Sequence, residues 1–237
     1  MKVVSKRRHF SGMLNALELT GRARTHVREC AELGCSLHDA ALAPLLAMRA
    51  ASRLDGIELS VVSAYRDLGR QVAIWNAKFR GERQLRDRGG RVLERAALAD
   101  QEAIDAILAW SALPGASRHH WGSDFDVIDR ARVRAGARIE LVSEQFAPGG
   151  PFAELAAWLD ANAARFGFFR PYATDRGGIH PEPWHLSYAA IAVPALAQLS
   201  LAVLAEAVAA SSMDARDQVL TRLAELYPRY VISIDSP

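Results

Sequence analysis

Cysteine is one of the scarcest residues in this 237-residue chain, which contains only Cys30 and Cys35. Small secreted domains that are held together by disulfides need more cysteines, so this class of protein is excluded. The two thiols could pair with each other, but we expect them to be reduced and structural. A chain of this length buries about 70–75% of its unfolded surface and needs no cross-links to hold a core.

An excess of charge of either sign is also lacking. The chain has 29 Lys and Arg against 27 Asp and Glu, which gives a formal net charge of +2. This balance excludes the strongly basic stripe of a dedicated nucleic-acid-binding protein. It also excludes the acidic, solvating composition of a disordered chain. We therefore expect a globular protein without a nucleic-acid partner.

Long hydrophobic runs are missing as well. Basic residues at positions 2–8 are typical of the start of a signal peptide, but residues 10–17 are interrupted by polar residues and glycine where its apolar region would follow. The charge-free run at 189–205 is shorter than the ~20 residues that a membrane span needs. The sequence thus predicts a packed helix there, no transmembrane segment and, in the absence of a signal peptide, a cytoplasmic location.

Hydrophobic periodicity predicts many helices and a few short strands. The N-terminal third is expected to be mainly helical, with a capping box at Ser36 and Asp39 opening a helix that ends near residue 55. Further helices are expected at 67–80, 104–108, 152–166 and, as a pair split near Ser211 and Ser212, over the last fifty residues. Strands are expected at 57–65, 123–128 and 184–188.

The order of these elements indicates the fold class. Helices and strands do not alternate regularly, as a doubly wound parallel sheet would require. We therefore predict an α+β fold with a small, mostly antiparallel sheet flanked by helices. The arginine-rich stretch at 81–95 is expected to be a solvated, mobile loop.

Two clusters hold most of the residues that are suited to chemistry. The first, residues 117–126, reads Ser-Arg-His-His-Trp-Gly-Ser-Asp-Phe-Asp, and the second, residues 180–188, reads His-Pro-Glu-Pro-Trp-His-Leu-Ser-Tyr. Histidine and carboxylate side chains are ligands of zinc, and a catalytic zinc uses three protein ligands and keeps one position open for water. Such a site also needs a carboxylate that takes a proton from this water.

The spacing within the clusters limits how they can meet. His119 and Asp126 would face opposite sides of a flat strand, so they converge only if the chain bends, most naturally at Gly122. Glu182 and His185 are three residues apart, but the proline at position 183 disfavours a helix before it. The helical zinc motif with two histidines four residues apart is therefore excluded.

With a third element, the two clusters resemble the motifs of the VanY-type zinc D-alanyl-D-alanine carboxypeptidases. Their wider group includes the VanX dipeptidases, lysostaphin-like endopeptidases and the hedgehog domain. The family motif Ser-x-Tyr-Arg followed by Gln is matched by Ser63, Tyr65, Arg66 and Gln71. The motif Ser-x-His-x-x-Gly-x-Ala-x-Asp is matched by Ser117, His119, Gly122 and Asp126. The motif Glu-x-Trp-His followed by Tyr is matched by Glu182, Trp184, His185 and Tyr188, and the three motifs occur in the family's order. These matches span about half of the chain.

The resemblance implies a hedgehog/D-Ala-D-Ala carboxypeptidase-like fold. Its metallopeptidase domain would occupy residues 36–190, between an N-terminal helical segment at 1–35 and a C-terminal helical extension at 191–237 packed on the same domain. It also implies one Zn²⁺ per chain. The implied roles are zinc ligand for His119, Asp126 and His185, general base for Glu182, carbonyl and oxyanion contact for Arg66, and substrate contact for Ser117, Gln71, Tyr65, Trp184 and Tyr188.

One position departs from the family pattern, because Asp124 stands where the family has alanine. On a strand it would point the same way as Asp126, so it could accept a hydrogen bond from a ligand histidine, pair with an arginine or compete as a ligand. We favour the first two. His120 is an alternative ligand and His180 a loop residue or substrate contact, whereas a Ser117–His120–Asp124 triad lacks the nucleophile-elbow signature. Three further histidines are expected to be surface groups: His9, His26 and His38.

The resemblance predicts a hydrolase that cleaves peptidoglycan-type cell-wall peptides containing D-amino acids, first of all as a D-alanyl-D-alanine carboxypeptidase. The alternatives are a stem-peptide endopeptidase and a non-catalytic zinc-containing domain that binds cell-wall peptides or a protein. Glu182 argues against the last, since a binding module needs no base beside the metal. Peptidoglycan lies outside the cytoplasm, which leaves open a soluble cytoplasmic peptide substrate, another export route or a start further upstream.

Overall fold

The computed structural model describes residues 13–133 and 139–237. Its helices are α1 (Ala16–Leu19), α2 (Asp39–Leu54), α3 (Leu68–Phe79), α4 (Asp100–Leu108), α5 (Ser143–Phe146), α6 (Ala153–Asn162), α7 (Ala189–Gln198), α8 (Leu201–Ala209) and α9 (Arg216–Tyr227). Its strands are β1 (Val27–Cys30), β2 (Cys35–His38), β3 (Leu59–Ser63), β4 (Leu85–Arg86), β5 (Val92–Leu93), β6 (Asp124–Asp129), β7 (Phe168–Phe169) and β8 (His185–Tyr188). The basic N-terminal residues and His9 lie outside the described residues.

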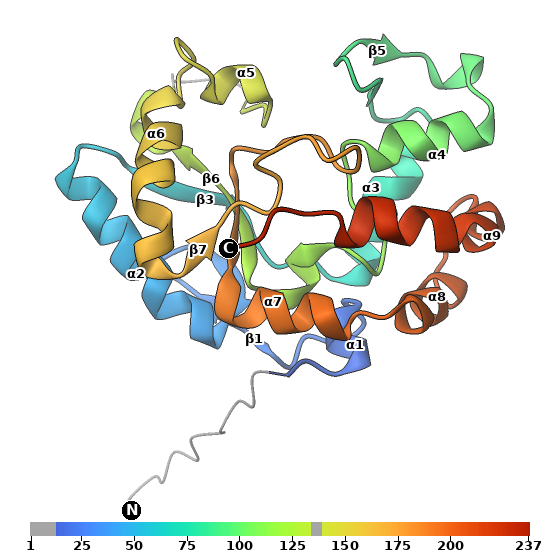
Figure 1. The fold of residues 1–237 in the computed structure, drawn as a ribbon, viewed down its shortest axis with the longest axis horizontal. Coiled ribbons are helices and arrows are strands. Elements are labelled where there is room, and N and C mark those ends of the chain that lie inside the picture. The colour runs from blue at the N-terminus through green and yellow to red at the C-terminus, as the bar shows by residue number, and fades with distance from the viewer. Residues whose placement is uncertain (1–12, 134–138) are drawn as a thin grey trace, which may run out of the picture.

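A four-stranded antiparallel sheet in the order β3-β6-β8-β7 brings distant parts of the chain together (Figure 1). Its strand β6 pairs with β3 on one side and with β8 on the other. Asp126 therefore lies opposite both Ser63 and His185. The predicted α+β class, with a small antiparallel sheet flanked by helices, is confirmed.

The two faces of this sheet bury different kinds of side chain. Phe125, Val127 and Leu186 belong to a hydrophobic cluster that includes residues of α2 and α6, the helices on the left in Figure 1. Side chains alternate along a strand, so Asp126 and His185 point away from this cluster. They are nevertheless buried, and the second face of the sheet therefore carries a buried polar site.

A second hydrophobic cluster covers the other side of that polar site. It combines Trp75 of α3 and Ile107 of α4 with residues of the C-terminal helices, such as Leu204 and Leu223. Trp121, at the end of a 3₁₀ turn at Arg118–Trp121, belongs to the same cluster. The C-terminal helices thus share a core with the segments that precede the site, while the domain limits at 35 and 190 stay predictions.

The N-terminal third differs from the helical expectation. Strands β1 and β2 form a hairpin in which Cys30 lies directly opposite Cys35, and both thiols are free. The hairpin is anchored by a distant turn, because the backbone N–H of His38 donates to the carbonyl of Gly122 at 2.8 Å. Ser36 lies in β2, and His38 rather than Ser36 caps α2 by accepting from the N–H of Ala40.

Two other segments differ in detail. The stretch at 81–95 contains the β4–β5 hairpin, in which Leu85 is buried and Arg86 donates to the carbonyl of Gly90. The last fifty residues form three helices instead of two, since Ser200 caps a new helix by accepting from the N–H of Val203. No single helix in the described ranges is long and apolar enough to cross a membrane, and α7 and α8 pass such a test only as a pair bent by 81°.

Gly122 makes the bend that the spacing of His119 and Asp126 requires. It ends the 3₁₀ turn with a φ of 66°, in the left-handed region that favours glycine. A Cβ atom on Gly122 would lie 2.4 Å from Cγ1 of Val27 and 2.7 Å from the backbone nitrogen of His38. The β1–β2 hairpin therefore packs directly on this turn and leaves no room for a side chain.

We expect Gly122→Ala to lower the free energy of unfolding by more than the ~1–2 kcal/mol that left-handed backbone alone costs an L-residue. The excess arises from the overlap with Val27 and His38 and should amount to about 1–3 kcal/mol. Gly34→Ala is the matched control, because Gly34 has a φ of 64° and nothing within 4 Å of the added methyl group. Equal losses for the two variants in urea denaturation would contradict the close packing at Gly122.

Candidate functional site

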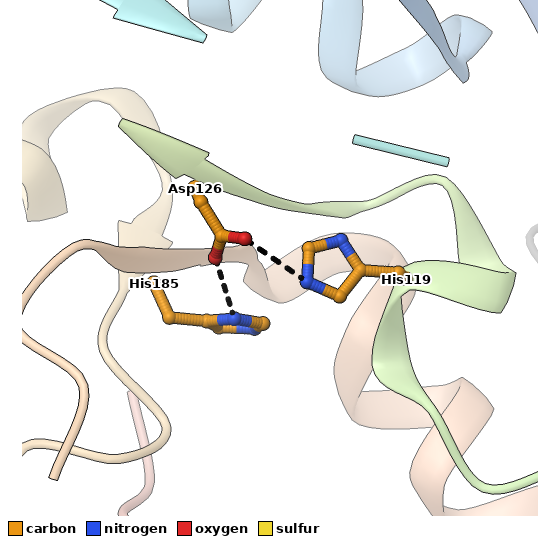
Figure 2. Close-up of side chains that lie close together, drawn as sticks. All are labelled: His119, Asp126 and His185. Carbon is orange, nitrogen blue, oxygen red and sulfur yellow. Dashed lines mark hydrogen bonds and ion pairs between the residues drawn. The ribbon is translucent and has the colours of Figure 1, made fainter. Parts of the chain in front are cut away.

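Three potential metal ligands from distant segments converge on the polar face of the sheet. His119, Asp126 and His185 each offer one ligand atom, and these atoms lie within 4.8 Å of one another (Figure 2). Asp126 Oδ2 is 3.5 Å from His119 Nε2, and Asp126 Oδ1 is 3.1 Å from His185 Nδ1. The structure thus brings together the three residues that the motifs single out.

The second nitrogen of each histidine faces an acceptor. His119 Nδ1 is 2.9 Å from the carbonyl oxygen of Ala64, and His185 Nε2 is 3.1 Å from Asp124 Oδ1. Carbonyl and carboxylate oxygens accept hydrogen bonds, so these two nitrogens carry protons and donate. This arrangement orients His119 Nε2 and His185 Nδ1 toward Asp126 as metal ligands. Two imidazole nitrogens and one carboxylate are a donor set that fits zinc.

The charges around His185 favour a cation at the same point. Burial alone would lower the pKa of His185, but its hydrogen bonds to Asp124 and Asp126 outweigh burial and raise this pKa to about 9. Burial also lowers the pKa of His119, to about 3, so that its imidazole is neutral. Burial acts to raise the pKa of Asp126, yet the hydrogen bond and charge of His185 hold it below its usual range. Asp126 is therefore charged, as a metal ligand must be, whereas His185 carries a proton that it would release when a metal binds.

Glu182 lies beside the three ligands. Its Oε2 is 3.5 Å from His185 Nδ1, and a turn closed by the His185 N–H and the Glu182 carbonyl at 3.1 Å brings the two residues together. A turn, and not a helix, therefore connects Glu182 to His185. Burial raises the pKa of Glu182 to about 7, although His185 acts in the opposite direction. A carboxylate with this pKa can both accept and return a proton near neutrality.

Arg66 follows β3 and is held rigidly by its neighbours. Its Nη2 donates to Ser63 Oγ at 3.1 Å, and its Nη1 donates to Gln71 Oε1 at 2.7 Å. Gln71 is buried and its Nε2 donates to the carbonyl of Ala112 at 2.7 Å. The oxygen and the nitrogen of the Gln71 side-chain amide are therefore both engaged within the protein, while its proposed contact with substrate stays a prediction.

A cavity of about 380 Å³ opens over these groups. Ser117 and Trp184 line it together with the ligands, Glu182 and Arg66, while their contact with substrate stays a prediction. Tyr65 and Tyr188 are not among the described residues that line it. Instead, the Tyr65 hydroxyl donates to the carbonyl of Ala23, and Tyr188 packs against Phe168.

Asp124 combines the two arrangements that we favoured for it. Besides accepting from His185, its Oδ1 accepts from Arg118 Nε at 2.8 Å, and its Oδ2 accepts from Ser123 Oγ at 2.6 Å. Arg118 is also buried and donates from Nη2 to Ser187 Oγ at 2.6 Å. Asp124 is buried against His185, and its ion pair with Arg118 offsets the negative charge of its carboxylate.

Two histidines outside the ligand set are buried, contrary to expectation. The prediction that His26 and His38 are surface groups is wrong, because each is only 2% exposed. His26 Nε2 lies 2.8 Å from the carbonyl oxygen of His120. His120 itself donates from Nδ1 to the carbonyl of Arg66 at 2.6 Å and accepts at Nε2 from the N–H of Gly115. His120 is therefore engaged behind the site, and no periodicity in the sequence marked this role.

Comparison with known proteins identifies the family. The sequence model of VanY, described as D-alanyl-D-alanine carboxypeptidase, matches residues 34–191. The chain belongs to the VanY family. An uncharacterized protein of Haemophilus influenzae is 30% identical over 122 residues, which are 51% of this chain and 93% of that protein. A D-alanyl-D-alanine carboxypeptidase of Enterococcus faecalis is 29% identical over 144 residues, 60% of this chain but only 44% of that protein.

Solved structures show the same fold. VanYB in complex with D-Alanine-D-Alanine superposes with a TM-score of 0.52 and 24% identity, over 73% of this chain and 82% of that one. A mutant of the vancomycin-resistance D,D-pentapeptidase VanY in complex with Zn(II) gives a TM-score of 0.51 and 24% identity, over 72% and 84% of the two chains. The predicted D-Ala-D-Ala carboxypeptidase-like fold is confirmed.

We expect Arg118→Leu to lower the free energy of unfolding by about 3–5 kcal/mol, because it leaves Asp124 charged and buried without its partner. The double variant Arg118→Leu/Asp124→Ala should be more stable than this single variant. Urea denaturation with a chelator present measures both without a contribution from bound metal. Arg132→Leu, at a half-exposed ion pair, is the control and should cost less than about 1 kcal/mol. A double variant as unstable as Arg118→Leu would contradict the coupling.

Proposed function

We propose that this VanY-family protein is a zinc-dependent carboxypeptidase that removes the terminal D-alanine from peptidoglycan-type peptides. The observation that carries the proposal is a partly buried glutamate beside two histidines and an aspartate, in one cavity with a fixed arginine. His119, Asp126 and His185 would hold one Zn²⁺ per chain. When bound, the ion supplies an acidified water and polarises the scissile carbonyl.

Glu182 acts as the general base and then as the proton donor. It takes a proton from the attacking water and delivers this proton to the leaving amine. Its pKa of about 7, raised by burial, suits both transfers near neutral pH. A positioned group of this kind contributes about 10²–10⁴-fold to the rate.

Arg66 stabilises the oxygen of the carbonyl that is attacked. Its guanidinium is held in place by Ser63 and Gln71, so little reorganisation is needed as negative charge develops on that oxygen. Its position on the wall of the cavity that also contains Glu182 supports this role.

The relatives support the class of substrate. The E. faecalis relative is a D-alanyl-D-alanine carboxypeptidase, and the structure of VanYB contains D-Alanine-D-Alanine. A stem-peptide endopeptidase is the second candidate. One observation favours it: a second cavity of about 180 Å³ shares Lys78, Trp110 and Leu141 with the first, so that the two provide room for peptide beyond a terminal dipeptide.

Products formed from a panel of stem peptides test the proposal. We expect wild-type protein with zinc to release a terminal D-alanine, and chelation to stop this release until zinc is returned. Glu182→Ala should reduce cleavage by at least about 10²-fold while one zinc per chain remains, because the base is lost and the ligands are kept. Mass spectrometry of the products and elemental analysis of the protein measure the two effects.

Glu144→Ala is the matched control, since Glu144 is exposed and does not line the cavity. It should leave cleavage unchanged. Release of internal fragments instead of D-alanine would select the endopeptidase. Equal cleavage by wild type and Glu182→Ala would reject the mechanism.

Replacing Arg66 tests the second catalytic role. We expect Arg66→Ala to lower kcat by about 10²–10³-fold with zinc content intact, because the developing oxyanion loses a fixed charge. Arg70→Ala removes an exposed positive charge nearby and should preserve most of the activity. Steady-state kinetics and elemental analysis separate these effects. A metal-free Arg66→Ala protein would assign Arg66 to the integrity of the site instead.

A further inference from the structure

Four cationic side chains line the main cavity, and two of them already have partners. Arg118 pairs with Asp124, and Arg66 is held by uncharged groups and faces the reacting carbonyl in the proposed mechanism. The other two, Lys78 and Arg83, have no role in that mechanism.

Lys78 and Arg83 retain unused hydrogen-bond donors. Lys78 lies in the last turn of α3, and its Nζ donates to Ser111 Oγ at 2.7 Å, which uses one of its three N–H groups. Arg83 is exposed at the edge of the same cavity. Within the described ranges, neither forms an ion pair with a carboxylate. They thus form a cationic pair that lines the cavity and is available to a ligand.

The surrounding charges support binding of an anion there. Burial, together with the nearby charges of Arg83 and Arg66, lowers the pKa of Lys78 to about 8, although Glu182 acts in the opposite direction. Three cations, Lys78, Arg83 and Arg66, therefore lie near the partly buried carboxylate of Glu182. An anionic group bound between Lys78 and Arg83 would relieve the repulsion among them.

The position of Lys78 relates this pair to the path of a bound peptide. Lys78, Trp110 and Leu141 line both the main cavity and the smaller one beside it. The main cavity contains the three ligand residues, whereas the smaller cavity contains none of them. Lys78 thus lies where the two cavities adjoin, within reach of a peptide that occupies both of them.

We propose that Lys78 and Arg83 form a subsite for a carboxylate of the bound peptide. This inference rests on the proposed function and deepens it, because it makes a carboxylate of the peptide, near the scissile bond, a requirement for tight binding. The carboxylate is either the main-chain terminus or an acidic side chain, which present the same group to the two cations. Charge-assisted hydrogen bonds from an ammonium and a guanidinium are the chemistry that recognises it.

Binding of uncleaved peptides tests the subsite directly. Zinc-loaded Glu182→Ala protein is titrated calorimetrically with four peptides that end in D-alanyl-D-alanine. They combine a terminal carboxylate or amide with glutamate or glutamine two residues before the dipeptide. Removing the recognised carboxylate should weaken binding about 10–100-fold, as expected for hydrogen bonds to charged groups.

Lys78→Met and Arg83→Gln, each in the Glu182→Ala protein, should abolish that difference between peptides. Arg91→Gln is the matched control, since it removes a charge from a side chain that is 80% exposed and does not line the cavity. Whether affinity depends on the terminal carboxylate or on the glutamate side chain shows which of the two groups the subsite binds. If Lys78→Met does not fold, the exposed Arg83 decides the test.

Equal affinity for all four peptides, or a charge preference that survives in the folded variants, would overturn the subsite. Its failure is distinct from failure of the proposed function. Charge-dependent binding without any cleavage by wild-type protein would reject the peptidase and keep the subsite. If wild-type protein cleaves the peptides but binds them equally well with and without either carboxylate, the peptidase is kept and the subsite is rejected.

Discussion

The concentration of buried carboxylates around His185 is the constraint on which the rest of the site depends. Asp124 and Asp126 are both buried, and Glu182 lies beside them. Burying one unpaired carboxylate is costly, so neighbouring carboxylates require compensating cations and donors. His185 lies between the two aspartates at 3.1 Å from each, and Arg118 pairs with Asp124. These groups are stable only as a connected set, which explains why the ligands come from elements that the fold holds rigidly.

The sheet and its two hydrophobic clusters provide that rigidity. One row across β3, β6 and β8 places Asp126 between Ser63 and His185, and the pleat turns the polar side chains toward the cavity. The chain is held on both sides of Gly122, because Trp121 at the end of the turn belongs to one cluster and Phe125 in β6 to the other. The position of His119 relative to Asp126 therefore follows from packing on both sides of Gly122, in addition to any metal that the ligands hold.

Local sequence signals predicted the elements that carry the site, but they did not predict contacts between residues far apart in the chain. Strands β3, β6 and β8 and helix α3 follow from β-branched runs and helical periodicity, and the motif spacing required a bend at Gly122. The β1–β2 hairpin was missed because it depends on a partner far away in the chain, through the bond from His38 to Gly122. The burial of His26 likewise depends on a hydrogen bond to a residue 94 positions later. Such contacts leave no periodic pattern, so single-sequence reasoning had no means of finding them.

Asp124, at the position where the family has alanine, was placed beside Asp126 by the sequence, but its partners became known only from the structure. The sequence alone showed that Asp124 would point the same way as Asp126, and the structure shows Arg118 and Ser123 as its partners. Because Arg118 offsets the charge of Asp124, the pair gives His185 an anionic hydrogen-bond acceptor without changing the net charge of the cavity. Such an acceptor increases the electron-donating ability of a ligand histidine. Of the other cationic side chains that line the cavity, Arg66 is held by uncharged partners, and Lys78 and Arg83 form no ion pair within the described ranges. The positive charge that Asp124 leaves uncompensated therefore belongs to these three residues.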